Sequence, residues 1–90
     1  MPLRSSAAVF VSAIGIALQK QRQKAGLSQQ ELADISGLHR TYISDIERRA
    51  RNFSISTYFK LALALGVQPS QLMKDVEALV EGGQVPTESL

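Results

Sequence analysis

The sequence predicts an all-α fold in which five helices form one small domain. Apolar residues recur at three- and four-residue steps along most of the chain, which is the period of an α-helix with one buried face. Glycines stand where four of these segments end, and no segment alternates polar and apolar residues as a strand does. Ninety residues suit a single domain with a modest core. We expect a flexible arm over residues 1–7, the domain over 8–81 and a disordered tail over 82–90.

The first helix is expected to run to about Ala25 and to stop at Gly26, with Ser5 or Ser6 as its cap. Gly15 lies in the middle of this segment and indicates either a close contact with another helix or a tolerated glycine. The apolar face of the helix is formed by Val9, Phe10, Ile14, Ala17 and Leu18.

The N-terminal stretch has some features of a signal peptide, because Arg4 precedes an apolar run over residues 7–18. No small-residue cleavage site is clearly placed, and the run continues into a helix that the core needs. It is also too short to span a membrane. We therefore expect a cytoplasmic protein without a membrane partner.

Residues 28–36 carry the clearest helix start in the chain. Ser28 is a capping residue, and Glu31 three positions later completes a capping box. The helix is expected to end at Ile35 or at the residue after it, before Gly37.

A third helix is expected from about Arg40 to Arg48, with Ile43 and Ile46 facing inward. Residues 28–48 thus form two short helices joined by a tight turn. This is the layout of a helix-turn-helix, whose second helix enters a groove of DNA.

A fourth helix is expected to begin after Ser54 or Ser56 and to run to Leu65, before Gly66. The buried face of this helix is predicted to comprise Ile55, Tyr58, Phe59, Ala62 and Leu65. Leu63 is expected to point away from that face, and a single exposed leucine carries little meaning.

A fifth helix is expected to begin at Pro69, since proline suits the first helical position, and to end at Gly82 and Gly83. This helix carries an apolar stripe formed by Leu72, Met73, Val76, Leu79 and Val80. The stripe either closes the protein's own core or forms the seam of a dimer, and we favour the dimer because little chain remains to cover it.

The composition excludes several classes of protein. The net charge is +2, but residues 1–60 hold nine lysines and arginines against four acidic residues, so the basic charge lies toward the front. A basic face suits a polyanion. There are no cysteines, and His39 alone cannot build a zinc site. Because no nucleophile–base pair, metal set or phosphate loop is evident, we expect no catalytic residues, no metal, no cofactor and no enzyme activity.

The third helix presents side chains that suit the edges of DNA bases. Arg40, at its start, has the geometry for a bidentate contact with guanine. Thr41 is able to bond a base edge or to pack on a thymine methyl, and Ser44 lies one turn after Arg40. Tyr42 has two interpretations that stay open, as a DNA contact or as a support for the helix.

Other polar residues around this helix are candidates for DNA contact. Asp45 either accepts from cytosine or holds Arg48 or Arg49 in place, and we favour the second. Gln29 stands at the first position of the second helix, where its side chain and free backbone N–H groups suit a phosphate. The expected phosphate clamp comprises Arg48, Arg49, Arg51 and Asn52.

The sequence also predicts one charged pair that stabilises the structure and does not contact DNA. Arg22, near the end of the first helix, and Glu47, on the inner edge of the third, are expected to meet in a partly buried ion pair. Removing either partner would leave an uncompensated charge.

Residues 14–73 resemble the phage-repressor helix-turn-helix family, which is also called the Cro-like or xenobiotic-response-element (XRE) family. The resemblance implies a five-helix, lambda-repressor-like DNA-binding domain that is usually dimeric and regulates transcription. The run from Arg40 to Arg48, followed by Arg51 and Asn52, is similar to the controller proteins of restriction–modification systems. The matching motifs are Arg22-x-x-x-Gly26-Leu27-Ser28-Gln29-x-x-Leu32-Ala33, Ile43-Ser44-x-Ile46-Glu47-Arg48, Arg51-Asn52 and Leu61-Ala62-x-Ala64-Leu65-Gly66-Val67.

The resemblance also implies roles by position. It makes Gln29 a phosphate or base contact, and it makes the pair of Arg22 and Glu47 structural. The implied groove readers are Arg40, Thr41 and Ser44.

Two functional hypotheses follow. The first is a homodimeric, sequence-specific transcriptional regulator that places two copies of the third helix about 34 Å apart on a near-palindromic operator. The alternative is an antitoxin-type or other protein-interaction module that also binds DNA, with its partner protein on the fifth helix or the tail.

Overall fold

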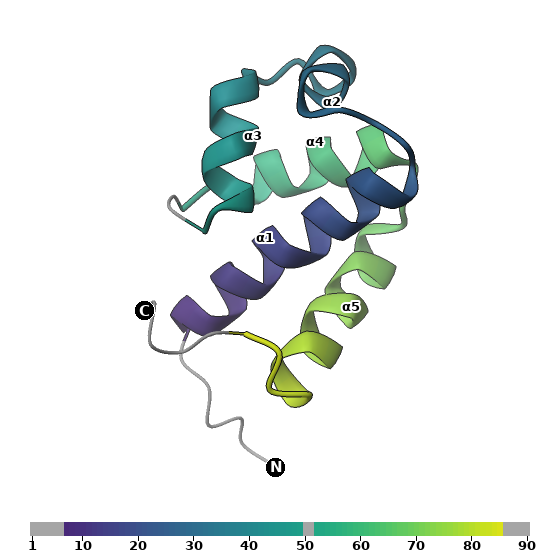
Figure 1. Ribbon diagram of the computed structural model, residues 1–90. Coiled ribbons are helices and arrows are strands. Elements are labelled where there is room, and N and C mark those ends of the chain that lie inside the picture. The colour runs from purple at the N-terminus through teal and green to yellow at the C-terminus, as the bar shows by residue number, and fades with distance from the viewer. Residues whose placement is uncertain (1–6, 50–51, 86–90) are drawn as a thin grey trace.

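Five α-helices surround one core in the computed structural model, which describes residues 7–49 and 52–85 (Figure 1). Within these ranges there is no strand, so the predicted all-α, five-helix fold is confirmed. None of these helices is both long enough and apolar enough to cross a lipid bilayer. The helices are α1 (Ala7–Lys24), α2 (Gln29–Ser36), α3 (Arg40–Glu47), α4 (Ile55–Leu65) and α5 (Pro69–Glu81).

Local signals set the ends of these helices largely as predicted. The Glu31 backbone N–H donates to Ser28 Oγ at 3.0 Å, and the Ser28 backbone N–H donates to Glu31 Oε1 at 2.9 Å. The capping box is therefore confirmed. Ser54, rather than Ser56, caps α4 by accepting from the Thr57 backbone N–H. The predicted caps of α1, Ser5 and Ser6, lie outside the described residues.

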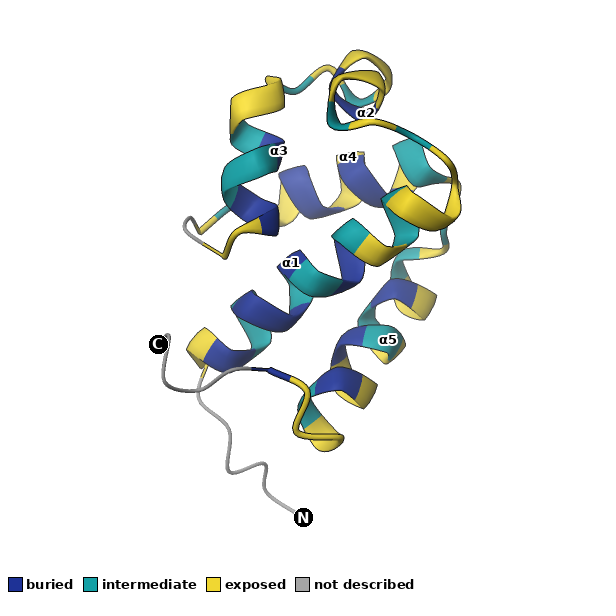
Figure 2. Cartoon of the chain, viewed as in Figure 1, coloured by how far each residue is buried: buried dark blue, intermediate teal, exposed yellow. Residues whose placement is uncertain are grey.

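The core lies around α1, which runs through the middle of the molecule (Figure 1). Helix α5 packs along one side of α1, and α3 and α4 pack against the other. Helix α2 packs on α3 and α4, away from α5. Figure 2 shows that each helix turns its buried residues inward. The largest fully buried side chains come from all five helices and are Leu18, Leu32, Ile43, Ile46, Leu61, Leu72 and Val76.

The buried face of α4 differs from the prediction. Ile55 and Phe59 were expected inside, but their residues are 66% and 46% exposed. Tyr58 and Ala62, which were also expected inside, are buried, and the Tyr58 hydroxyl donates to the Pro69 carbonyl oxygen at 2.6 Å, at the start of α5. This bond fixes the rotation of α4 and turns the Ile55 side outward. The buried residues of α4 are Thr57, Tyr58, Leu61 and Ala62.

The apolar stripe of α5 belongs to the chain's own core. Leu72 and Val76 are 0% exposed and Leu79 is 6% exposed, while Met73 and Val80 are partly buried against the same core. The predicted dimer seam is therefore wrong for Leu72, Val76 and Leu79, which the chain's own core covers, and it stays a prediction for the partly buried Met73 and Val80. The physical reason is that α5 packs along α1, which covers the stripe.

The domain also extends beyond its predicted end at residue 81. Helix α5 ends at Glu81, and the Gln84 backbone N–H then donates to the Leu79 carbonyl at 3.0 Å. This turn directs the chain back onto the domain, where Val85 is 6% exposed and joins the core. The prediction of disorder is therefore wrong for residues 82–85, and residues 86–90 lie outside the described part of the chain.

Replacing Val85 with serine is expected to lower the free energy of unfolding by about 1–3 kcal/mol, because a buried apolar side chain is lost. Urea denaturation followed by circular dichroism measures this change. Gln84→Ser, at the exposed neighbouring position, is the control and should leave the midpoint unchanged. Equal midpoints for all three proteins would show that residue 85 contributes nothing to the core.

Candidate nucleic-acid interface

Helix α3 has one face fixed in the core and one face free. Ile43, Ile46 and Glu47 are buried. Arg40 and Thr41 are exposed, and they form the turn at the start of α3 (Figure 2). The predicted division of this helix between inward and outward side chains is therefore present.

The segment between α2 and α3 is short and sharply turned. Gly37 ends α2 with φ of 76°, the left-handed conformation that glycine adopts without strain. The Leu38 backbone N–H then donates to Ser36 Oγ at 3.3 Å, and α3 begins at Arg40. Helices α2 and α3 pack on each other, so residues 28–48 form the predicted helix-turn-helix.

The predicted ion pair connects α1 to the end of α3. Arg22 Nε lies 2.7 Å from Glu47 Oε2, and Arg22 Nη2 donates to Glu47 Oε1 at 2.9 Å. This is the bidentate geometry of a strong arginine–carboxylate pair. The hydrogen bond to Glu47 raises the pKa of the Arg22 guanidinium, which keeps its charge. Arg22 Nη1 also donates to the Leu27 carbonyl at 2.8 Å, so the pair fixes the loop before α2 as well.

Gln29 is part of the same network. Its Nε2 donates to Glu47 Oε1 at 3.0 Å, so the side chain is oriented by a residue of α3. The sequence predicts Gln29 only as a phosphate or base contact, and that role stays a prediction. The link to Glu47 was missed because 18 residues separate the two in the chain and no local pattern connects them.

Asp45 and Arg48 form a second ion pair on the surface of α3. Arg48 Nη2 lies 2.7 Å from Asp45 Oδ1, and the Arg48 side chain is 68% exposed. This contact agrees with the favoured interpretation that Asp45 holds an arginine in place. An exposed pair of this kind contributes little to stability. Tyr42 is half-buried against the core, which leaves both of its interpretations open.

The chain leaves α3 through a residue in an unusual conformation. Arg49 has φ of 63°, in the left-handed region that residues other than glycine seldom occupy. Its backbone N–H donates to the Ile46 carbonyl oxygen at 2.9 Å. Sequence analysis missed this turn, because no glycine or asparagine marks the position. Arg49 and Asn52 are exposed, and Arg51 lies outside the described residues.

Glu47→Ala is expected to lower the free energy of unfolding by an amount on the order of 3 kcal/mol, because it leaves the partly buried Arg22 without its partner. Thermal melts measure the loss. Arg22→Met combined with Glu47→Leu should recover part of it, since an apolar pair carries no desolvation cost. An unchanged melting temperature for Glu47→Ala would contradict the structural role of the pair.

Comparison with known proteins identifies the family. The family model described as helix-turn-helix matches residues 18–72. The control protein C.BamHI of Bacillus amyloliquefaciens is 52% identical over 59 residues, which is 61% of this chain and 73% of that protein. The solved restriction–modification controller protein C.AhdI of Aeromonas hydrophila is 42% identical with a TM-score of 0.66, over 69% of this chain and 94% of that one. C.Esp1396I bound to a 19 base pair DNA duplex is 31% identical with a TM-score of 0.75, over 83% and 97%. The chain belongs to the helix-turn-helix family of DNA-binding transcriptional regulators and is not an enzyme.

Proposed function

We propose that this protein is a sequence-specific transcriptional regulator that recognises its operator through α3. The observation that supports this most directly is the division of α3. Its buried side is held by Ile43, Ile46 and the Glu47 ion pair, and its other side leaves Arg40 and Thr41 exposed. A helix fixed in this way presents its outer side chains in one orientation, as base recognition requires.

The outer face of α3, formed by the exposed Arg40 and Thr41 and the half-buried Ser44, has the chemistry for reading the major groove. Arg40 is able to donate two hydrogen bonds to guanine O6 and N7, and the two hydroxyls suit base edges or a thymine methyl. Arg49 and Gln29 flank this face and suit phosphates, with the free N–H groups at the start of α2 beside Gln29.

The relatives favour a particular biological setting. C.BamHI is named a control protein and C.AhdI a restriction–modification controller. The stretch that matches this chain covers 73% of C.BamHI and 94% of C.AhdI. We therefore propose that this chain is a cytoplasmic controller of a restriction–modification operon. A restriction endonuclease or methyltransferase gene beside its own would support this, and a toxin gene there would favour the antitoxin-type alternative.

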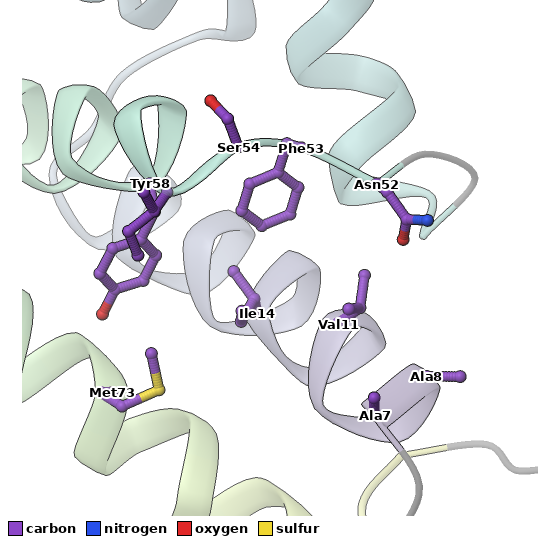
Figure 3. A pocket seen from close by; sticks show the side chains of 10 residues that line it. Ala7, Ala8, Val11, Ile14, Asn52, Phe53, Ser54, Tyr58 and Met73 are labelled. Carbon is purple, nitrogen blue, oxygen red and sulfur yellow. The ribbon is translucent and has the colours of Figure 1, made fainter.

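A homodimer would use the exposed side of α4. Ile55, Phe59 and Leu63 follow one another at four-residue steps and form one apolar stripe, with Leu63 73% exposed. Ile55 also lines a hollow of about 490 Å³ beside this stripe. Figure 3 shows the hollow between Phe53 and Tyr58 on one side and side chains of α1 on the other. The α1 and α5 residues of its lining are Ala7, Ala8, Val11, Ile14 and Met73.

A second copy of this chain is the partner that this surface fits best. A two-fold interface must carry both its projecting and its receiving parts on one patch, because the same patch is used twice. The apolar stripe and the adjacent hollow meet this requirement together. A two-fold dimer would also present two α3 helices to a near-palindromic operator, about one helical turn of DNA apart.

Arg40→Ala is expected to weaken binding to the operator by about 1–3 kcal/mol, because a bidentate base contact is lost, while binding to random DNA stays near normal. Operator duplexes selected from random DNA by the wild-type protein serve as the probe. Arg49→Ala is the matched arginine control and should weaken both kinds of DNA equally, with a shallower salt dependence. Equal losses on both duplexes for Arg40→Ala would reject Arg40 as a base reader.

Ile55→Ser combined with Phe59→Ser is expected to raise the dimer dissociation constant by at least about tenfold, since buried aromatic and aliphatic side chains dominate such interfaces. Sedimentation equilibrium over a range of concentrations measures this. Ile35→Ser is the control, because Ile35 is an apolar residue of α2 that is 58% exposed and outside the stripe. Dimerisation that persists in the double variant would place the interface elsewhere, and a wild-type monomer would rule out the homodimer.

A further inference from the structure

Helix α1 touches the end of α3 directly through Gly15. A methyl group on the Cα of Gly15 would lie well inside van der Waals contact of the Ile46 carbonyl oxygen. It would also lie 3.3 Å from Cγ of Arg49. Gly15 is buried, so nothing but its lack of a side chain allows the two helices to come this close.

The local preference of α1 runs against glycine at this position. Glycine in the middle of a helix is less favourable than alanine, because it loses more backbone freedom on folding. Gly15 stands near the middle of an 18-residue helix and has an ordinary helical backbone, so neither a turn nor a cap requires it. The requirement comes from the contact with α3, which resolves the two interpretations that the sequence left open.

The contact also involves the C-terminal end of α3, where the chain reaches Arg49. The Ile46 carbonyl that rests on Gly15 also accepts the backbone N–H of Arg49. Arg49 is the residue with left-handed backbone, at which the chain leaves α3. The close approach at Gly15, the end of α3 and the left-handed backbone of Arg49 are therefore coupled through one carbonyl group.

Two contact points along α1 hold this end of α3. Gly15 receives Ile46, and Arg22, seven residues later on the same face of α1, binds Glu47. Ile46 and Glu47 are adjacent in α3. Two points of contact on one rigid helix prevent α3 from rotating about either of them. The direction in which α3 presents its outer face is consequently set by both.

We propose that Gly15 is a specificity-determining positioning residue, which sets how closely α3 approaches α1 and so aligns Arg40, Thr41 and Ser44 with base edges. This rests on the proposed function. Gly15 itself does not touch DNA in this proposal. Base contacts depend on side-chain geometry within fractions of an ångström, whereas phosphate contacts by flexible arginines tolerate small displacements.

The test is Gly15→Ala, measured on the selected operator duplex and on a random duplex at a temperature where the variant is folded. Operator affinity should fall at least about tenfold, comparable to the loss of one base contact, while random-DNA affinity and its salt dependence stay near those of the wild type. If helix preference alone mattered at this position, alanine would raise the melting temperature and leave operator affinity unchanged. A higher melting temperature with full discrimination would overturn the proposal.

Val76→Ala is the control that separates an effect of lower stability on DNA discrimination from an effect of the contact at Gly15. This variant opens a cavity in α5, which packs against α1 and α4. It should lower the melting temperature but keep the ratio of operator to random-DNA affinity. Loss of this ratio in Val76→Ala as well would mean that discrimination follows stability and not the contact at Gly15. If the wild-type chain selects no sequence from random DNA, the proposed function itself fails.

Arg49→Gly keeps the proposal testable if Gly15→Ala does not fold. It removes the side chain that lies beside Gly15 and relieves the left-handed backbone, but the Ile46 carbonyl remains on Gly15. Both affinities should fall by the same factor, because only a phosphate contact is lost. Selective loss of operator binding would show that the Arg49 side chain, and not the approach at Gly15, aligns α3.

Discussion

The bidentate ion pair between Arg22 and Glu47 is the interaction on which the binding surface depends. It joins the C-terminal half of α1 and the loop before α2 to the end of α3, which lies 25 residues further along the chain. Removing two charges from water is costly, and the Leu27 carbonyl and the Gln29 amide satisfy more of their hydrogen-bonding groups. Because such a pair forms in only one arrangement of the helices, we interpret it as a device for specificity of structure rather than for net stability.

Features that depend on neighbouring residues were predictable from the sequence. The capping box of Ser28 and Glu31 and the proline at the start of α5 each involve a few consecutive positions, and their physical effect does not depend on the rest of the fold. The inward side of α3 was also predictable, since Ile43 and Ile46 leave a single apolar face on a polar helix. These features were enough to establish five helices and a helix-turn-helix.

Features that depend on distant partners were not predictable. Helix α4 has apolar residues around most of its circumference, and its buried side was decided by the bond from Tyr58 to the Pro69 carbonyl. The stripe of α5 was visible, but whether α1 or a second copy would cover it was not. The bonds from Gln29 to Glu47 and from Gln21 to Asp75 span 18 and 54 residues, and no periodic pattern reports on them. Of the candidate DNA contacts on α3, Arg40 and Thr41 are exposed and Ser44 is half-buried, and the bond from Gln29 to Glu47 was not predicted.

The surface pair of Asp45 and Arg48 has a consequence for how this protein responds to ionic strength. Salt weakens DNA binding because each phosphate that a protein neutralises releases condensed cations. An arginine that already carries a carboxylate counterion neutralises less phosphate charge. In α3, Asp45 thus provides part of the negative charge that dissolved anions would otherwise provide around Arg48. The affinity of this protein for DNA is expected to vary less with the cellular potassium concentration than the number of its arginines suggests.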